Sequence, residues 1–275
     1  MTRPTEQMLD ARGTRIRVLR AGLGPPLIFL HGASGHVGWL PFLDTLARRF
    51  DVIAPEHPGF GASDDPAWLD QPGDLAYFYL DLMAQLGLKN VHLVGTSLGG
   101  WIAAELAVRN TSRLASLTLV CAVGITADGA VMDDIFRMSA EENARRFYFD
   151  PARVQRRLES LKSADARVLV RNRSTVVRLG YPRFVNPQLA KWLHRVDVPT
   201  LLIWGENDGL VPVTFGEAYR RLIPNASLTV IPQAGHAPFE EQPEAFLARF
   251  EAFLQARAPG SSVEPHGPLR EPGID

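Results

Sequence analysis

Gly95-Thr96-Ser97-Leu98-Gly99-Gly100 joins an apolar strand pattern to an apolar helix pattern through a G-x-S-x-G turn, and it is the most informative part of the sequence. The strand pattern is Val91-His92-Leu93-Val94, and the helix pattern runs over residues 98–109. Such a turn holds its serine in a strained conformation, and small neighbouring residues let adjacent backbones approach. The hydroxyl of Ser97 then projects beside a helix N-terminus, which favours developing negative charge. The pattern predicts a nucleophilic serine.

Apolar runs of strand length alternate with amphipathic helix patterns along most of the chain. The predicted strands are 14–19, 27–30, 51–55, 91–94, 117–121, 200–204 and 228–231. The predicted helices are 38–49, 75–86, 98–109 and 246–255. The first strand alternates in polarity, which is typical of a sheet edge. The overall alternation indicates an α/β fold with a parallel sheet covered by helices on both faces, and ligands bind such sheets beyond the carboxyl ends of the strands.

Residues 124–195 interrupt this alternation with a mainly helical stretch between two strands. We therefore expect a core of residues 1–123 and 196–257, a helical cap or lid of residues 124–195, and a disordered Pro-, Gly- and Ser-rich tail of residues 258–275. The cap contains 14 Lys and Arg against 8 Asp and Glu, a net charge of +6, and the whole chain carries −1, so the remainder carries −7. The excess reflects either solvated helix faces or attraction of an anionic substrate.

The composition is that of an ordinary globular protein: 275 residues, 46% hydrophobic and 21% charged. The single cysteine, Cys121, excludes an intrachain disulfide, and its apolar surroundings predict a small core residue. We find no signal peptide or membrane-spanning run, so we expect a cytoplasmic protein without a membrane partner. A net charge of −1 gives no reason to expect nucleic acid as a partner. Both a monomer and a homodimer are compatible with the sequence.

A serine hydroxyl is a weak nucleophile and needs a general base. Among the seven histidines, His236 follows the last predicted strand through a short glycine-containing loop, which brings it to the same sheet end as Ser97. Asp208 follows the strand 200–204 and is the candidate for the carboxylate that orients the base, with Glu206 as its competitor in the same loop. The chain order Ser97, Asp208, His236 is the one expected for a G-x-S-x-G hydrolase.

The same chemistry needs backbone N–H donors for a developing oxyanion. We predict the N–H of Leu98, the residue after the nucleophile, and the N–H of Ala33 in the loop after the strand 27–30. Ser34 and His36 in that loop are candidates for substrate contacts. The other histidines close to predicted strands or turns are interpreted as structural: His31, His57 and His92. No His, Asp or Glu cluster has metal-ligand spacing, so we expect no metal.

Five stretches in this order resemble the α/β-hydrolase superfamily, in particular its compact bacterial serine esterase and carbon–carbon bond hydrolase branches. They are His31-Gly32, Pro58-Gly59-Phe60-Gly61-Ala62-Ser63-Asp64, Gly95–Gly100, Trp204-Gly205-Glu206-Asn207-Asp208 and Gly235-His236. The resemblance runs from about Gly24 to Leu254 and implies a mostly parallel eight-stranded sheet with a cap after the sixth strand. It also implies a cofactor-independent reaction, in which the serine is acylated and water then attacks.

The resemblance leaves three functions open. The first is hydrolysis of a small carboxylic ester or lactone, and the second is hydrolysis of a carbon–carbon bond in a ring-fission-type dienoic keto-acid. For the second, the loop Ala33-Ser34-Gly35 is less glycine-rich than in those hydrolases. The third is a ligand receptor that retains the triad and turns over slowly. Dehalogenases and epoxide hydrolases of the superfamily have an aspartate where this chain has Ser97. Candidates for holding a substrate carboxylate are Arg137, Arg145, Arg146, Arg171, Arg173 and Arg178.

Overall fold

The computed structural model describes residues 3–35, 38–130 and 132–255, and its centre is a sheet of eight strands. The strands are β1 (Thr5–Ala11), β2 (Thr14–Ala21), β3 (Pro26–Leu30), β4 (Asp51–Pro55), β5 (Val91–Thr96), β6 (Leu114–Val120), β7 (Thr200–Gly205) and β8 (Ala226–Ile231). Their order in the sheet is β1-β2-β4-β3-β5-β6-β7-β8. β2 runs antiparallel to both of its neighbours, and the other pairs are parallel.

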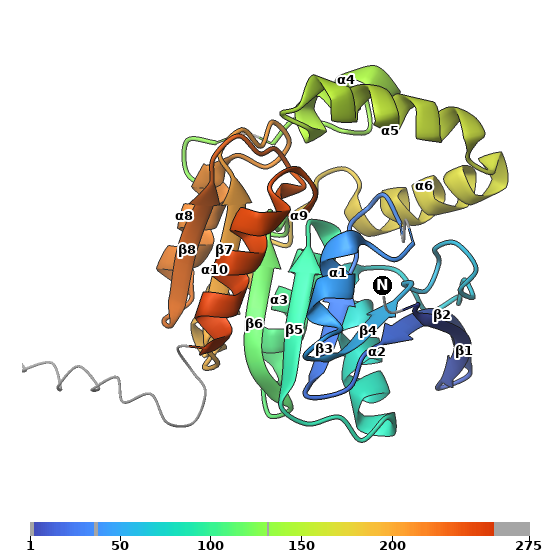
Figure 1. The fold of residues 1–275 in the computed structure, drawn as a ribbon, viewed down its shortest axis with the longest axis vertical. Coiled ribbons are helices and arrows are strands. Elements are labelled where there is room, and N and C mark those ends of the chain that lie inside the picture. The colour runs from blue at the N-terminus through green and yellow to red at the C-terminus, as the bar shows by residue number, and fades with distance from the viewer. Residues whose placement is uncertain (1–2, 36–37, 131, 256–275) are drawn as a thin grey trace, which may run out of the picture.

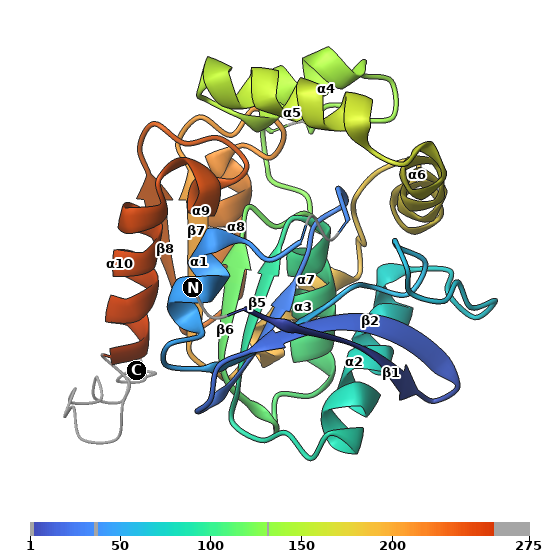
Figure 2. The same ribbon diagram turned by 45° about the vertical axis from the view of Figure 1, so that its right-hand side comes forward.

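Helices cover both faces of this sheet. They are α1 (Pro41–Leu46), α2 (Pro72–Gln85), α3 (Leu98–Arg109), α8 (Val213–Leu222), α9 (Pro238–Glu241) and α10 (Pro243–Gln255). α1 and α10 lie on one face, where Phe42 and Phe246 pack edge to face, and α2, α3 and α8 lie on the other (Figures 1 and 2). The strands β3 to β7 are almost entirely buried, as expected for a sheet covered on both faces.

The chain forms a helical cap between the sixth and seventh strands. Its helices are α4 (Ala140–Phe147), α5 (Pro151–Ser163), α6 (Ala166–Gly180), α7 (Leu189–Trp192) and the 3₁₀ helix η1 (Leu193–Arg195). α4 and α5 lie over the carboxyl ends of the strands, whereas α7 and η1 pack against α3 (Figures 1 and 2). The predicted fold class is therefore confirmed: an α/β fold with a mostly parallel eight-stranded sheet, helices on both faces and a cap after the sixth strand.

Two details of the prediction are wrong. The strand from Thr14 is not at the sheet edge, because β1 pairs along its full length and takes that place. β1 was missed because six of its seven residues are exposed or half-buried, so its sequence shows no apolar alternation. The helix predicted over 38–49 covers only Pro41–Leu46, since Pro41 has no N–H to donate and stands at the first helical position.

In the described part of the chain, none of the helices has the length and apolar character needed to span a bilayer. The predicted tail of residues 258–275 lies outside the described residues.

Candidate active site

Ser97 lies between β5 and α3 in a left-handed conformation, with φ 54° and ψ −116°. The turn is held by the Ser97 N–H, which donates to the Val120 carbonyl at 2.9 Å, and by the Ser97 carbonyl, which accepts from Trp101 at 3.1 Å. A side chain at Gly99 would press on the Leu30 carbonyl oxygen, so the turn requires glycine there. The half-buried serine therefore stands at the carboxyl end of β5, in the strained geometry expected from the sequence.

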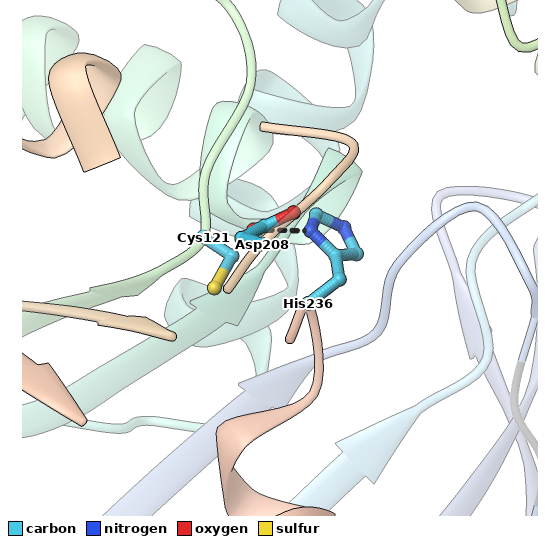
Figure 3. A group of neighbouring side chains, drawn as sticks. All are labelled: Cys121, Asp208 and His236. Carbon is cyan, nitrogen blue, oxygen red and sulfur yellow. Dashed lines mark hydrogen bonds and ion pairs between the residues drawn. The ribbon is translucent and has the colours of Figure 1, made fainter. Parts of the chain in front are cut away.

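Asp208 and His236 form a buried acid–base pair. Nδ1 of His236 lies 2.7 Å from Oδ2 of Asp208, and the two residues are only 3% and 6% exposed (Figure 3). Oδ1 of Asp208 accepts the N–H groups of Leu210 and Val211, each at 2.9 Å. These bonds fix the carboxylate and leave Nε2 of His236 as the ring nitrogen available for chemistry. Glu206, the competing carboxylate, is exposed in the same loop.

Cys121 is a buried neighbour of this pair. It follows β6 instead of lying within a strand, and its Sγ, an oxygen of Asp208 and a nitrogen of His236 lie within 4.8 Å of one another (Figure 3). Within the described residues this is the one group of three potential metal ligands. Burial, together with the charge of Asp208, raises the pKa of the Cys121 thiol well above its ordinary value. A protonated thiol is a poor metal ligand, so Cys121 fits a packing role beside Asp208 and His236 better than a metal centre.

The end of α4 is hydrogen-bonded to both the acid and the base loop. The N–H of His236 donates to the Phe147 carbonyl at 2.7 Å, and the N–H of Gly209 donates to the Arg146 carbonyl at 3.1 Å. The Phe147 ring stands edge-on to the His236 ring, with centroids 5.0 Å apart. Any side chain at Gly235 would collide with the Phe147 carbonyl. The sequence analysis missed these contacts. The available signal was a glycine next to each of the two residues, Gly209 after Asp208 and Gly235 before His236, which allows another backbone to approach.

The loop after β3 approaches the serine from the other side. A Cβ on Gly32 would lie 3.1 Å from Cβ of Ser97, which shows how closely the two backbones pack. Below the loop, the His57 ring bonds to the His31 carbonyl at 2.9 Å and to the Tyr79 hydroxyl at 2.5 Å, and the His57 N–H donates to His31 at 3.0 Å. The buried histidines His31 and His57 thus form the structural support of the loop.

A cavity of about 30 Å³ brings these parts together. It is lined by Ala33, Ser97, Val123, Met132, Ile135, Phe184, Leu210, Val211 and His236. Its wall is apolar except at the serine and the histidine. This volume is below the range of roughly 300–1,000 Å³ that is typical of ligand sites. A larger hollow of about 290 Å³ between α2, α3 and α7 contains no serine or histidine, so we place the chemistry at the smaller cavity.

Five of the six arginines suggested for binding a substrate carboxylate are bonded to other residues, so the structure does not single out any of them for that role. Arg145 pairs with Glu141, Arg146 with Asp133, and Arg178 with Asp65. Arg171 donates to the carbonyls of Gly61 and Ser63, and Arg173 donates to the carbonyl of Phe136. These bonds lie within the cap or join it to the core, and Arg137 is not among the residues that line the cavity.

Most candidates for the site converge on one place. Ser97, His236 and Ala33 line the cavity, Asp208 bonds to the histidine, and Leu98 begins the helix after the serine. The N–H of Leu98 is one of the first four of α3, which have no partner inside the helix. Ser34 is exposed at the rim, where it accepts a hydrogen bond from Arg157 at 3.1 Å. His36 lies outside the described residues.

Comparison with known proteins gives a consistent set of relatives. The model of the family described as "Alpha/beta hydrolase family" matches residues 27–249. The chain is 31% identical over 253 residues to the pimeloyl-[acyl-carrier protein] methyl ester esterase of Nitrosomonas europaea, an alignment that covers 86% of this chain and 98% of that protein. It is 26% identical over 272 residues to the 2-hydroxy-6-oxo-6-(2'-aminophenyl)hexa-2,4-dienoic acid hydrolase of Metapseudomonas resinovorans, with 92% of each chain covered.

Among solved structures, a bacterial membrane phospholipase A superimposes with a TM-score of 0.79 at 26% identity, covering 92% of this chain and 86% of that one. The similarity to this structure therefore covers most of the chain.

Proposed function

Since the chain belongs to the alpha/beta hydrolase family and is a hydrolase, we propose that it cleaves a small carboxylic ester or lactone by a serine mechanism. The observation that carries the proposal is the buried 2.7 Å hydrogen bond between His236 and Asp208, at a cavity that His236 shares with Ser97. This combination supports a base that is oriented by a carboxylate and adjoins a nucleophile. The esterase among the relatives supports the ester class.

In the proposed mechanism, Oγ of Ser97 attacks the ester carbonyl carbon while Nε2 of His236 takes the proton of the serine hydroxyl. The negative charge that develops on the carbonyl oxygen is stabilised by the N–H groups of Leu98 and Ala33. His236 then gives its proton to the leaving alcohol, and an acyl-enzyme ester remains on Ser97. Water attacks this ester with the same histidine as base, which releases the acid and restores the serine. The Asp208 carboxylate stabilises the imidazolium in both steps.

A second candidate is hydrolysis of a carbon–carbon bond in a dienoic keto-acid. Its support is the Metapseudomonas relative, which covers both chains to 92% and is named for that class of substrate. Against it stands the loop Ala33-Ser34-Gly35, in which only one of three residues is glycine. A receptor with slow turnover is a third candidate.

The test is steady-state hydrolysis of short-chain p-nitrophenyl esters by the wild-type protein and by Ser97→Ala. We expect sustained turnover in the wild type and a loss of at least about 10⁴-fold in the variant, since removal of a nucleophile disables the whole triad. Ser112→Ala, in an exposed loop, is the matched control and should keep full activity. Undiminished hydrolysis by Ser97→Ala would refute the proposal. A single burst would favour the receptor, and turnover of dienoic keto-acids alone would favour the second candidate.

A further inference from the structure

Arg157 reaches across from the cap to the active-site rim. Its side chain lies on α5 and is half-buried, and its Nη2 donates to the hydroxyl of Ser34 at 3.1 Å. Ser34 is the neighbour of Ala33, which lines the cavity together with Ser97 and His236. The guanidinium is therefore bonded to the residue that follows a cavity-lining residue in the chain. Among the described residues of the cap, no other arginine bonds to the loop of residues 31–35.

The charge of Arg157 is not consumed by a carboxylate. Within the ranges that the structure describes, Arg157 forms no ion pair, whereas its neighbour Arg156 pairs with Asp150 at 3.7 Å. The acidic groups close to Arg157 are accounted for. Glu240 pairs with Arg153 at 3.6 Å and accepts the Tyr148 hydroxyl at 3.2 Å. Next to Glu240, the carboxylate of Glu241 accepts N–H groups from Phe149, Asp150 and Gly235. Among the described residues, the one side-chain hydrogen-bond partner of Arg157 is therefore the Ser34 hydroxyl, and the Glu240 carboxylate interacts with its charge without forming an ion pair.

We propose that Arg157 recognises a carboxylate on the substrate, so that the enzyme prefers esters that carry an anionic group over their neutral analogues. The inference rests on the proposed function, which it narrows to a substrate class. The exposed Ser34 hydroxyl occupies one N–H of the guanidinium, and a carboxylate can replace it in a bidentate arrangement. A bidentate pair between a guanidinium and a carboxylate adds a second N–H···O bond and an opposite charge to what a hydroxyl provides, so the exchange favours the anion.

In this proposal the apolar cavity and the charged rim bind different parts of the substrate. The lining residues Met132, Ile135 and Phe184 provide no charge, so the uncharged part of the substrate occupies the cavity beside the serine. The anionic end stays at the rim, where Arg157 and Ser34 remain in contact with water. This arrangement avoids burying a carboxylate in an apolar cavity, which would be costly.

The experiment compares matched esters in three proteins. One pair, mono-p-nitrophenyl adipate and p-nitrophenyl hexanoate, carries the carboxylate on the acyl side. A second pair, 4-carboxyphenyl butyrate and 4-carbamoylphenyl butyrate, carries it on the leaving group. The readout is the selectivity, the kcat/KM for the anionic ester divided by that for its neutral partner. The proteins are the wild type, Arg157→Gln and the matched control Arg156→Gln, which removes one charge from the same helix.

We expect Arg157→Gln to lower the selectivity at least about tenfold for one of the two pairs, equivalent to about 1.4 kcal/mol. Arg156→Gln should leave it within about twofold of the wild type, since a solvent-screened charge contributes little. Equal selectivity in the wild type and Arg157→Gln, or an equal loss in both arginine variants, would overturn the inference. Equal selectivity would mean that Arg157 only holds the loop of Ser34. An equal loss in both variants would mean that selectivity depends only on the net charge of the helix.

A binding measurement separates this result from a failure of the proposed function. If no ester is hydrolysed in a Ser97-dependent way, the proposed function fails, but recognition can still be measured. Calorimetric titration of Ser97→Ala and of Ser97→Ala/Arg157→Gln with monoethyl adipate then gives the answer. We expect a dissociation constant at least about tenfold lower when Arg157 is present. Equal constants, or no detectable binding to either protein, would overturn the inference.

Discussion

Replacing Asp208 by asparagine should abolish most activity through the position of a single proton. In the wild type, Oδ1 of Asp208 accepts the N–H groups of Leu210 and Val211, and Oδ2 faces Nδ1 of His236. The two backbone donors require an oxygen opposite them, so the amide oxygen of the asparagine must take the Oδ1 position. Its NH₂ group then points at Nδ1, which has to accept. The proton of the neutral ring moves to Nε2, where it prevents His236 from taking the proton of Ser97.

The size of the expected fall in kcat follows from the loss of the general base while the rest of the site is kept. Elsewhere, the same tautomer error in a serine triad costs about 10⁴ in kcat, which corresponds to about 5.4 kcal/mol at 1.36 kcal/mol per tenfold change. The fold should persist, because each of the three side-chain hydrogen bonds of residue 208 still joins one donor to one acceptor. Glu206→Gln provides the matched control: it removes the same charge from the same loop at an exposed position.

The assay is kcat for p-nitrophenyl butyrate, with thermal unfolding measured on the same preparations. We expect a fall of about 10⁴-fold in Asp208→Asn and a change below about twofold in Glu206→Gln. A variant Asp208→Asn that retains more than about one-tenth of the wild-type kcat would refute the reasoning, since the wrong tautomer cannot act as base. A large loss in Glu206→Gln instead would transfer the orienting role to that carboxylate.

Two further predictions concern stability. Arg17→Met should lower the free energy of unfolding in urea by about 3–5 kcal/mol, because Glu56 is 3% exposed and would lose a partner that binds it through Nε at 3.1 Å and Nη2 at 2.9 Å. Arg15→Met, at an exposed ion pair, should cost much less, and equal losses would contradict the argument. Burial lowers the pKa of His92 below 6.5, so the unfolded chain binds its proton first. The contribution of His92 to stability is therefore retained above about pH 6.5 and lost as the pH falls towards the folded pKa. His92→Gln should weaken this loss of stability when the free energy of unfolding is measured between about pH 7 and 5. An unchanged dependence of that free energy on pH would exclude His92 as the source of the loss.

The sequence was most informative where burial on both faces leaves a continuous apolar run. β4 and α3 have the predicted bounds, Asp51–Pro55 and Leu98–Arg109, because nearly all their residues are buried. β1 could not be found in this way, since its pairing with β2 depends on backbone hydrogen bonds while its side chains face water. Local sequence contains the pattern of burial but not the pairing of a solvated edge strand.

The candidate site shows the same division. Ser97, Asp208 and His236 could be proposed because each follows a strand, and parallel strands end at one edge of the sheet. The partners of the cap arginines could not be predicted, because they lie far away in the sequence. Arg178 and Asp65 are 113 residues apart, and Arg157 and Ser34 are 123 residues apart. Which charges on a helical cap are neutralised depends on how the cap lies over the core, and helical periodicity leaves that open. Arg157 was therefore absent from the candidates, although the basic excess of the cap pointed towards the right segment.

The cap contributes to the proposed chemistry in two separable ways. The end of α4 is bonded to the loops of both Asp208 and His236 through the carbonyls of Arg146 and Phe147, so this part of the cap belongs to the scaffold of the base. α5 instead presents Arg157 to the rim through a side chain that makes a single bond to Ser34. Changes to the backbone at the end of α4 should thus alter the rate for every substrate, whereas changes to side chains on α5 should alter the choice among substrates. Because a short turn between the two helices keeps these roles on different elements, the substrate preference can change without disturbing the acid–base pair.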